Sequence, residues 1–316
     1  MRHRSTYTIV YDNEESFVKA NRLITVFTPT YNRKACIHRC YESLQRQTSY
    51  NFEWLIIDDG STDNTAELIR RWQAEEARFP IRYCYKENGG LHTGYNKGIE
   101  LAETELFMCI DSDDWMPEDA VERIEKIWNE VSGQGYAGIM GIDRYEDGSC
   151  VGGAFPTHVH EMFLYEKLTK YRIPGDKKLV HRTDLLKKVA PMPTFPGEKC
   201  FNPSYLMYQL DQFGKLYVTN DCFCIVDYQP DGMSSNFYKQ LRNSPLSFAE
   251  TRKLYLSFPD TTPAFKLRHS IHYVSNCIMA KRLWQGIRES VFPGYTWLAL
   301  IPGFLLHLLV LYKTRE

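Results

Sequence analysis

The chain has 316 residues, with 38 Lys and Arg against 39 Asp and Glu and a formal net charge of -1. This length suits one large domain, or one domain with an appendage, and the neutral charge balance gives no reason to expect nucleic acid as a partner. The nine cysteines include no Cys-x-x-Cys pair and no paired framework, so we expect reduced thiols and a cytosolic compartment.

The first 22 residues are polar and charged and contain no apolar signal-peptide core. We expect them to form an N-terminal extension to a domain that covers residues 23–235. Within that domain, residues 23–135 alternate apolar strand-like runs with helical patterns.

Four strands are expected in this first half, at residues 23–27, 52–57, 81–85 and 106–110. Helical patterns follow them, beginning near Cys36, Asn64, Gly94 and Pro117. Asn64 and Glu67 have the spacing of an N-terminal cap pairing. Strands separated by helices predict an α/β fold, with a mostly parallel, Rossmann-like sheet flanked by helices.

A polar cluster follows each of these strands. The clusters occupy residues 28–32, 58–63, 88–92 and 111–114. In a parallel sheet, ligands bind beyond the carboxyl ends of the strands. We therefore expect the binding site at this edge of the sheet.

The last of these clusters carries three carboxylates within four residues, at positions 111, 113 and 114. Side chains of an extended strand repeat every second residue, so Asp111 and Asp113 point the same way. Two like charges repel unless a cation lies between them or one takes a proton, and oxygen ligands suit Mg²⁺ or Mn²⁺. A diphosphate-bearing substrate requires such a cation. The alternative is a solvated acidic turn that caps the next helix.

Residues 136–235 are less regular and show no linker, so we expect them to form an acceptor-side half of the same domain. Residues 236–316 are expected to be helical, with breaks near Pro259 and Pro263.

An apolar segment, residues 295–312, contains no charged residue and is interrupted by Pro302 and Gly303. A spanning helix needs roughly 20 apolar residues, so a membrane-surface or re-entrant anchor is favoured over a full span. Trp297 and Tyr312 would lie at the level of the lipid headgroups. The alternative is a helix packed on the protein's own core.

Four motifs in this order resemble glycosyltransferase family 2, across about residues 23–228. They are Pro29-Thr30-Tyr31-Asn32, Asp58-Asp59-Gly60-Ser61-Thr62-Asp63, Asn88-Gly89-Gly90 and Asp111-Ser112-Asp113-Asp114. The resemblance implies the GT-A fold and an inverting transfer of a sugar from a nucleotide-sugar donor.

The resemblance also implies roles for individual donor-site residues. Asp59 matches the carboxylate that binds the nucleotide base, and Pro29 and Tyr31 match the loop that packs against the nucleoside. Asn88, Gly89 and Gly90 would let backbone approach the donor closely.

The acidic run matches the family's Asp-x-Asp motif. Asp111 and Asp113 would bind the divalent ion, Mg²⁺ or Mn²⁺, and the sugar nucleotide, with Asp113 essential for catalysis. Asp114 lies in the same motif and is a third candidate metal ligand.

The family's general base often belongs to a Glu-Asp pair after a glycine-rich loop. Here the matching residues are Glu198 and Lys199. Lys is a poor general base, so Glu198 is the expected catalytic base. The alternatives for Glu198 are a salt-bridge partner or a helix cap, with three aspartates in reserve as the base, Asp176, Asp211 and Asp227.

The sequence therefore predicts a metal-dependent inverting glycosyltransferase that moves a hexose-type unit, from a UDP-sugar by preference, to a saccharide acceptor. The apolar segment favours a lipid-linked acceptor at the cytoplasmic membrane face, in the synthesis of a bacterial surface polysaccharide.

Two other functions remain open. One is a sugar-nucleotide-forming nucleotidyltransferase, although residues 28–33 lack the glycines of its usual triphosphate loop. The other is an inactive binding protein that kept the fold, which Lys199 in place of the family's Asp would favour.

Overall fold

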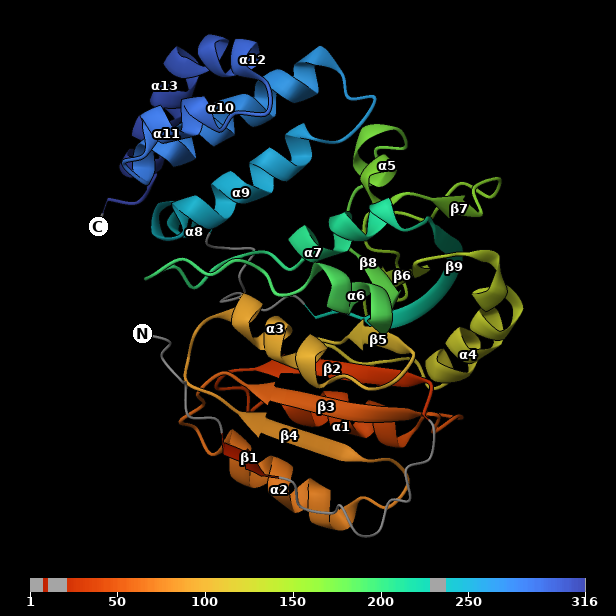
Figure 1. Cartoon of the computed structure of the whole chain (residues 1–316). Coiled ribbons are helices and arrows are strands. Elements are labelled where there is room, and N and C mark those ends of the chain that lie inside the picture. The colour runs from red at the N-terminus through yellow and green to blue at the C-terminus, as the bar shows by residue number, and fades with distance from the viewer. Residues whose placement is uncertain (1–7, 11–21, 228–236, 316) are drawn as a thin grey trace. The chain divides into compact units, whose positions relative to one another are not determined.

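The computed structural model describes residues 8–10, 22–227 and 237–315. The predicted N-terminal extension, residues 1–22, lies outside the described residues except for strand β1 (Thr8–Val10) and residue 22. The chain divides into two compact units (Figure 1). The first unit comprises residues 1–89, 93–191 and 206–228, and the second comprises residues 90–92, 192–205 and 229–316.

A nine-stranded sheet forms the centre of the first unit, in the order β1-β4-β3-β2-β5-β8-β6-β9-β7. Its strands after β1 are β2 (Ile24–Thr30), β3 (Phe52–Asp58), β4 (Ile81–Tyr85), β5 (Leu106–Cys109), β6 (Gly138–Arg144), β7 (Glu161–Met162), β8 (Lys177–Arg182) and β9 (Leu216–Ile225). Among the described strands, β1, β7 and β8 run antiparallel to their neighbours and the others run parallel. The predicted α/β fold with a mostly parallel sheet is confirmed.

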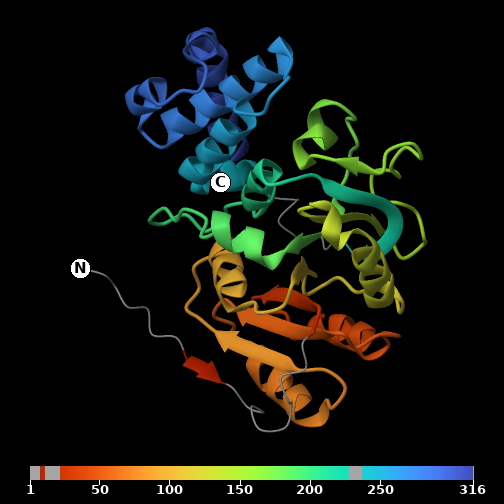
Figure 2. The same cartoon turned by 45° about the vertical axis from the view of Figure 1, so that its right-hand side comes forward.

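The helices before residue 210 connect these strands. They are α1 (Ile37–Gln45), α2 (Thr65–Glu75), α3 (Leu91–Leu101), α4 (Ala120–Val131), α5 (Leu164–Thr169), α6 (Thr183–Val189) and α7 (Ser204–Gln209). Right-handed crossovers place α1 and α2 on the same face of the sheet, because β2, β3 and β4 follow one another in one direction. In Figure 1, α2 lies below the strands and α1 lies behind β3 and β4. Figure 2 shows the same strands and helices from another side.

The central strands are buried on both faces, as apolar runs of parallel sheets usually are. Val26 and Trp54 face the core beneath α1 and α2, where Trp54 stacks near Trp72 with ring centroids 6.0 Å apart. Phe27, the next residue along β2, points to the opposite face and meets Tyr95 of α3 at 4.9 Å. This alternation fixes the register of β2, since a shift by one residue would exchange the two faces.

The order in which successive strands join the sheet reverses at β2. The chain adds β3 and β4 on one side of β2 and then crosses to place β5 on the other. Thr30 pairs with Asp58, and Asp58 with Tyr85, so the carboxyl ends of β2, β3 and β4 are level. Such a reversal between neighbouring parallel strands is where open α/β sheets bind ligands.

Two helix starts differ from the prediction. Asn64 does not cap α2, because it adopts a left-handed conformation (φ 65°) and its side chain makes no cap hydrogen bond. The side chain of Asp63 provides the hydrogen-bond acceptor at this helix start instead. It accepts bonds from the amide and the hydroxyl of Thr65. Pro117 lies in a turn before α4, since the amide of Ala120 donates to its carbonyl at 3.1 Å.

The second unit is helical, as predicted. Its helices are α8 (Phe237–Asn243), α9 (Pro245–Leu256), α10 (Pro263–Met279), α11 (Leu283–Arg288), α12 (Pro293–Leu298) and α13 (Leu300–Lys313). The central helix is α10, which packs against α9, α11, α12 and α13.

The expected interruption at Pro302 and Gly303 is wrong. Helix α13 runs through both residues, because Pro302 lies in the first turn, where no intrahelical N–H bond is needed. A side chain at Gly303 would come within 2.6 Å of Val274, so glycine lets α13 approach α10 closely. None of the helices in the described residues has the length and apolarity needed to traverse a bilayer.

Candidate active site

Asp59 lies just beyond the carboxyl end of β3 and is held in place by several donors. Its carboxylate accepts bonds from the Lys86 ammonium, from the amide of Gly89 (2.9 Å) and from the Asn88 side chain (3.2 Å). Asp59 and Lys86 are both buried. The predicted nucleotide-binding residues Asp59, Asn88 and Gly89 are therefore brought together.

The neighbouring Asp58 has a structural role. It is fully buried and accepts bonds from the amide of Ser61 and the hydroxyl of Tyr83, both at 2.7 Å. Burial and this bond raise the pKa of Tyr83. The arrangement stabilises the turn that carries Asp59.

The loop after β2 is joined to this turn. The amide of Asn32 donates to the hydroxyl of Ser61, and the amide of Thr62 donates to the Asn32 side chain, both at 2.8 Å. Pro29 is half-buried in β2, and Tyr31 is 48% exposed. An exposed tyrosine beside the Asp59 turn is available for packing against a planar ligand.

The acidic run follows β5, next to β2 in the sheet. Asp111 is exposed, and Asp113 is only partly buried. Burial and the negative charge of Asp111 raise the pKa of Asp113. The two carboxylates thus repel each other, as the sequence predicted.

Asp114 has different surroundings from its neighbours. It is buried, and its oxygens contact the amide of Asp227 (3.3 Å) and the thiol of Cys224 (3.7 Å), both from the end of β9. Burial raises the pKa of Asp114 to about 8, with added repulsion from Asp111 and Asp113. These contacts give Asp114 a role in joining the acidic run to β9.

A buried lysine lies close to the same run. The ammonium of Lys178 on β8 donates to the carbonyl of Cys109 at 3.2 Å. Burial alone would lower the pKa of Lys178, but Cys224, Asp143, Asp114 and Asp111 raise it well above its ordinary value. Lys178 therefore stays charged and offsets part of the negative charge beneath the acidic run.

The acidic run fits a divalent cation through two of its members. Asp111 and Asp113 are hard oxygen ligands whose mutual repulsion a cation would relieve. In the part of the chain that the structure describes, no three His, Cys, Asp or Glu side chains are grouped to hold a metal ion. A cation here would take its remaining ligands from water or from substrate phosphates, as Mg²⁺ commonly does.

Glu198 belongs to the second unit and acts as a helix cap there. Its two carboxylate oxygens accept bonds from the amides of Leu246 and Ser247, both at 2.8 Å, and from the Ser247 hydroxyl at 2.7 Å. These donors form the amino end of α9, where a carboxylate is favoured. Its expected role as the general base remains a prediction.

Gly90 is required by a close backbone approach within the second unit. Its φ is 94°, and a side chain there would meet the Lys199 carbonyl at 2.1 Å. The sequence assigned this glycine to donor binding, whereas the structure gives it a packing reason. Its contact with a donor also remains a prediction.

The sequence interpretation missed two features of the site. Lys86 directly follows β4, and a Lys at the end of a parallel strand was a signal that could have been used. The other is Arg39, whose guanidinium lies 4.0 Å from the centre of the Trp115 ring and pairs with Asp227 at 2.6 Å. Since 188 residues separate Arg39 from Asp227, no local pattern predicts that pair.

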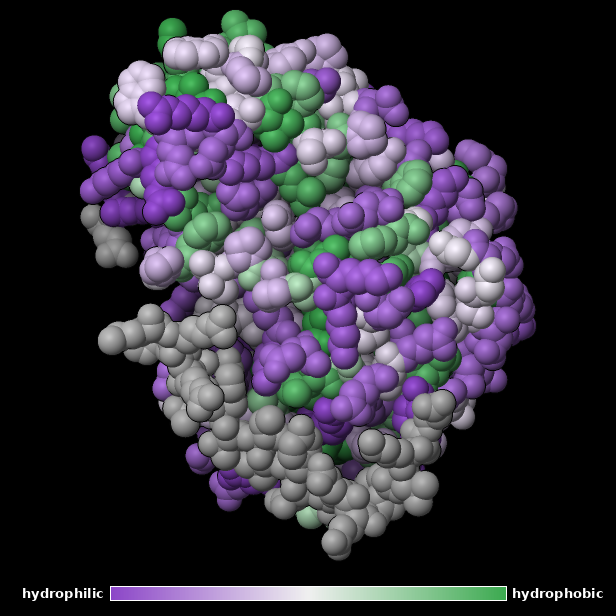
Figure 3. All heavy atoms as spheres, viewed as in Figure 1, coloured by the Kyte–Doolittle hydropathy of each residue, from purple (hydrophilic) through white to green (hydrophobic). Residues whose placement is uncertain are grey.

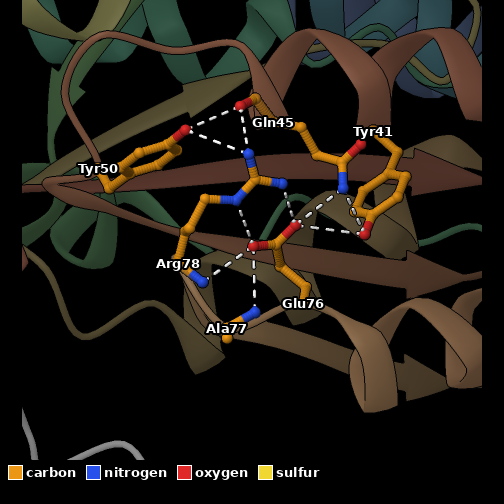
Figure 4. A network of polar contacts seen from close by, with 6 residues as sticks. All are labelled: Tyr41, Gln45, Tyr50, Glu76, Ala77 and Arg78. Atoms are coloured by element: carbon orange, nitrogen blue, oxygen red, sulfur yellow. Dashed lines mark hydrogen bonds and ion pairs between the residues drawn. The ribbon is translucent and has the colours of Figure 1, made fainter.

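A second polar cluster, the Glu76 network, lies at the amino edge of the same sheet (Figure 4). Arg78 forms two side-chain bonds to the Glu76 carboxylate at 2.8 Å, and Gln45 and Tyr41 donate to it at 3.0 and 3.2 Å. These residues help to line a hollow of about 490 Å³. None of the predicted site residues lies in it.

Residues 25–184 match the family described as Glycosyl transferase family 2. The chain is 32% identical to the glycosyltransferase GlyA of Streptococcus pneumoniae serotype 4 over 138 residues, which cover 39% of this chain and 20% of GlyA. It is 36% identical to the hyaluronan synthase of Pasteurella multocida over 109 residues, 34% of this chain and 11% of the synthase. The chain thus spans only a minor part of these relatives.

Two solved structures share the fold. Residues 1–349 of TarS from S. aureus, in complex with UDP-GlcNAc, align with a TM-score of 0.58 at 17% identity, covering 93% of each chain. The mannosyltransferase PcManGT from Pyrobaculum calidifontis, in complex with GDP-Man and Mn²⁺, aligns with a TM-score of 0.56 at 17% identity, covering 92% of this chain and 88% of that one.

Proposed function

The chain belongs to glycosyltransferase family 2, and on that premise we propose that it transfers one hexose-type sugar from a nucleotide-sugar donor to a saccharide acceptor. The family and its GT-A fold are those that the sequence predicted. One observation carries the proposal. The Asp59 turn follows β3 and the Asp111–Asp113 pair follows β5, the two parallel strands on either side of β2, where the order of strand addition reverses.

A UDP-sugar is the favoured donor. The carboxylate of Asp59 can accept the imide N–H of uracil, and the exposed ring of Tyr31 can pack on the base. TarS binds UDP-GlcNAc and PcManGT binds GDP-Man, so relatives in fold use both nucleotides. This supports a sugar linked to a nucleoside diphosphate as the donor class.

Metal dependence is the second part of the proposal. Asp111 and Asp113 would hold Mg²⁺ or Mn²⁺, which would neutralise charge developing on the departing diphosphate. PcManGT was solved with Mn²⁺, which supports a divalent ion in this fold. Asp114 is not included, because its oxygens contact groups at the end of β9.

The transfer would invert the anomeric centre. A carboxylate would remove the acceptor hydroxyl proton as that oxygen attacks the anomeric carbon, on the face opposite the leaving nucleotide. Glu198 remains the proposed base, and its cap bonds to α9 make a direct test necessary.

We place the enzyme at the cytoplasmic face of a membrane, with a lipid-linked saccharide as acceptor, in surface-polysaccharide synthesis. The uncharged segment 295–312 and the polysaccharide synthases among the relatives support this choice. The nucleotidyltransferase alternative is disfavoured by the family match, and an inactive binding protein by the intact Asp59, Asp111 and Asp113.

A donor screen tests the proposal. The purified chain is incubated with UDP- and GDP-sugars in Mn²⁺ or Mg²⁺, and nucleotide release is measured with and without saccharide acceptors. Release from one donor that stops on chelation supports the proposal. Release of pyrophosphate from a nucleoside triphosphate would indicate the nucleotidyltransferase instead, and binding without turnover would indicate the inactive protein.

A further inference from the structure

Helix α13 exposes apolar side chains along the face that is directed away from α10. These side chains, with their neighbours on α11 and α12, form what we call the apolar face, Trp284, Trp297, Leu298, Ile301, Phe304, Leu305, Leu308, Leu309 and Tyr312. The six members on α13 have the spacing i, i+3, i+4, i+7, i+8 and i+11, which places them on one side of a helix. Exposure reaches 77% at Ile301 and 66% at Tyr312.

The opposite side of α13 is already used for packing. Gly303 and Val310 are buried, and Arg242 of α8 donates to the Thr314 carbonyl at 2.8 Å, which fixes the end of the helix. A helix at a protein–water boundary normally has a polar outer side, whereas α13 is apolar on both. We therefore expect the exposed apolar side of α13 to be covered by a binding partner.

Basic residues flank the apolar face. Lys281, Arg282, Arg288, Lys313 and Arg315 are exposed, and none forms an ion pair with a carboxylate in the described residues. Glu289 is the acidic residue of segment 281–315, and it is paired with Lys253 at 2.7 Å. Figure 3 shows hydrophobic side chains at the top of the C-terminal helices, beside hydrophilic ones.

We propose that this apolar face docks on a lipid surface that carries anionic headgroups, with α13 lying in the plane of the interface. The fourteen residues of α13 extend for about 21 Å, less than the roughly 30 Å of a bilayer's hydrocarbon core. Trp297 and Tyr312, near the two ends of the face, suit the headgroup level, and the basic residues complement anionic lipid.

Charge disfavours a second copy of the chain as the occupant. A twofold pairing of the apolar face would place the same surface of both copies together. Lys313 and Arg315 would then face like charges across the interface, which costs binding energy.

This docking proposal depends on the proposed function only through the membrane location of the enzyme. Its test uses vesicles and needs no sugar nucleotide. The full chain is sedimented with vesicles of phosphatidylcholine, with or without phosphatidylglycerol. We expect binding to the anionic vesicles at least tenfold tighter than to the neutral ones. The Leu305→Glu, Leu309→Glu double variant should lose at least tenfold of this binding, since charges replace two exposed apolar side chains.

Phe213→Glu, at a 38% exposed apolar residue of the first unit, is the matched control and should bind as the wild type. Lys313→Gln with Arg315→Gln should lower binding to anionic vesicles by about 30-fold, the scale expected for two basic residues near the surface. It should leave binding to neutral vesicles unchanged.

Several results would overturn the proposal. They are no binding by the wild type, unchanged binding by the Leu305→Glu, Leu309→Glu variant, and equal binding to neutral and anionic vesicles. A wild-type dimer in light scattering that this variant turns into monomers would assign the face to a second copy. A urea unfolding transition in the variant at the wild-type midpoint separates lost docking from lost folding. Absence of UDP-sugar binding in every protein would count against the proposed function alone.

Discussion

The two edges of the sheet in the first unit treat their carboxylates in opposite ways. At the amino edge, burial would raise the pKa of Glu76, but hydrogen bonds from Arg78 and Gln45 outweigh it and lower that pKa to about 2. At the carboxyl edge, burial and like charge raise the pKa of Asp113, and they raise that of Asp114 to about 8. The Glu76 carboxylate is paired with a cation, whereas the acidic run at the carboxyl edge has its charge only partly offset, by Lys178.

The difference in hydrogen bonding between these carboxylates distinguishes residues that stabilise the fold from residues that are expected to bind a ligand. A satisfied carboxylate strengthens the fold, because its bonds form in the folded chain and are lost on unfolding. Neighbouring carboxylates that repel each other cost stability and are expected where a ligand completes the charge balance. Substitutions at the two edges should therefore have opposite signatures.

The largest effect is expected for Asp113→Asn. Transfer should fall by about 10³-fold, because the cation and the diphosphate lose a ligand charge, while the free energy of unfolding stays equal or rises. Nucleotide release and urea unfolding measure the two quantities. Asp260→Asn, at an exposed residue whose left-handed backbone (φ 54°) asparagine also accepts, is the control and should change neither. Full activity in Asp113→Asn would contradict the assignment of Asp113 to ligand binding.

Glu76→Gln should give the reverse signature. Loss of the ion pair with Arg78 should cost about 3 kcal/mol of unfolding free energy, with turnover per folded molecule unchanged. Urea unfolding of the wild type and the variant checks the first quantity, and an active-site titration checks the second. A loss of turnover without a loss of stability would contradict the assignment.

Glu198→Gln tests whether the contrast extends to the second unit. As the general base, Glu198 should lose about 10²-fold in transfer on substitution, with the donor KM unchanged. Ser247→Ala is the matched control, because it removes one bond of the same cap and keeps the carboxylate. If both variants lose activity equally, the cap explains the effect and the base lies elsewhere, with Asp227 the next candidate.

Asp59 is a carboxylate at the carboxyl edge whose hydrogen bonds are satisfied, so Asp59→Asn should affect both stability and donor binding. The donor KM should rise about tenfold, and stability should fall by about 2 kcal/mol, since the Lys86 ammonium stays buried without its carboxylate. In the Asp59→Asn, Lys86→Gln double variant stability should recover in part while the KM stays high. Recovery of the KM would mean that the pair serves the fold alone.

The smallest effect is a dependence on pH. The pKa of Glu76 is about 2 in the folded chain against an ordinary 4.5, so its contribution is complete above about pH 4.5 and is lost as the pH falls towards 2. The stability difference between the wild type and Glu76→Gln should therefore be constant from pH 7 to about 5 and then shrink. Urea unfolding at several pH values measures it, and a difference that grows with acid would contradict the cause assigned.

Much of the carboxyl edge could be predicted from the sequence. Apolar runs ending in polar clusters gave the strand ends of β2, β3 and β4 within a few residues, because burial on both faces makes parallel strands easy to recognise. The order of the motifs then predicted that Asp59 and Asp111 would share an edge.

Other features could not be predicted, because they depend on contacts distant in sequence. Asp114 is bonded to Asp227, 113 residues away, and Glu198 caps a helix that begins nearly 50 residues later. The Asn64 cap failed for a local reason, because Asp63 offered a better acceptor one residue earlier. The sequence predicts a break at Pro302, but a proline in the first turn of a helix does not interrupt it.

Calorimetry on the wild type and Asp113→Asn, with Mn²⁺ and a panel of sugar nucleotides, tests whether Asp113 holds a cation that binds the donor's diphosphate. We expect the wild type to bind one sugar nucleotide more tightly with Mn²⁺ than without, and Asp113→Asn to lose this dependence. A wild type that binds neither Mn²⁺ nor any sugar nucleotide would contradict this expectation, as would an unchanged Mn²⁺ dependence in Asp113→Asn.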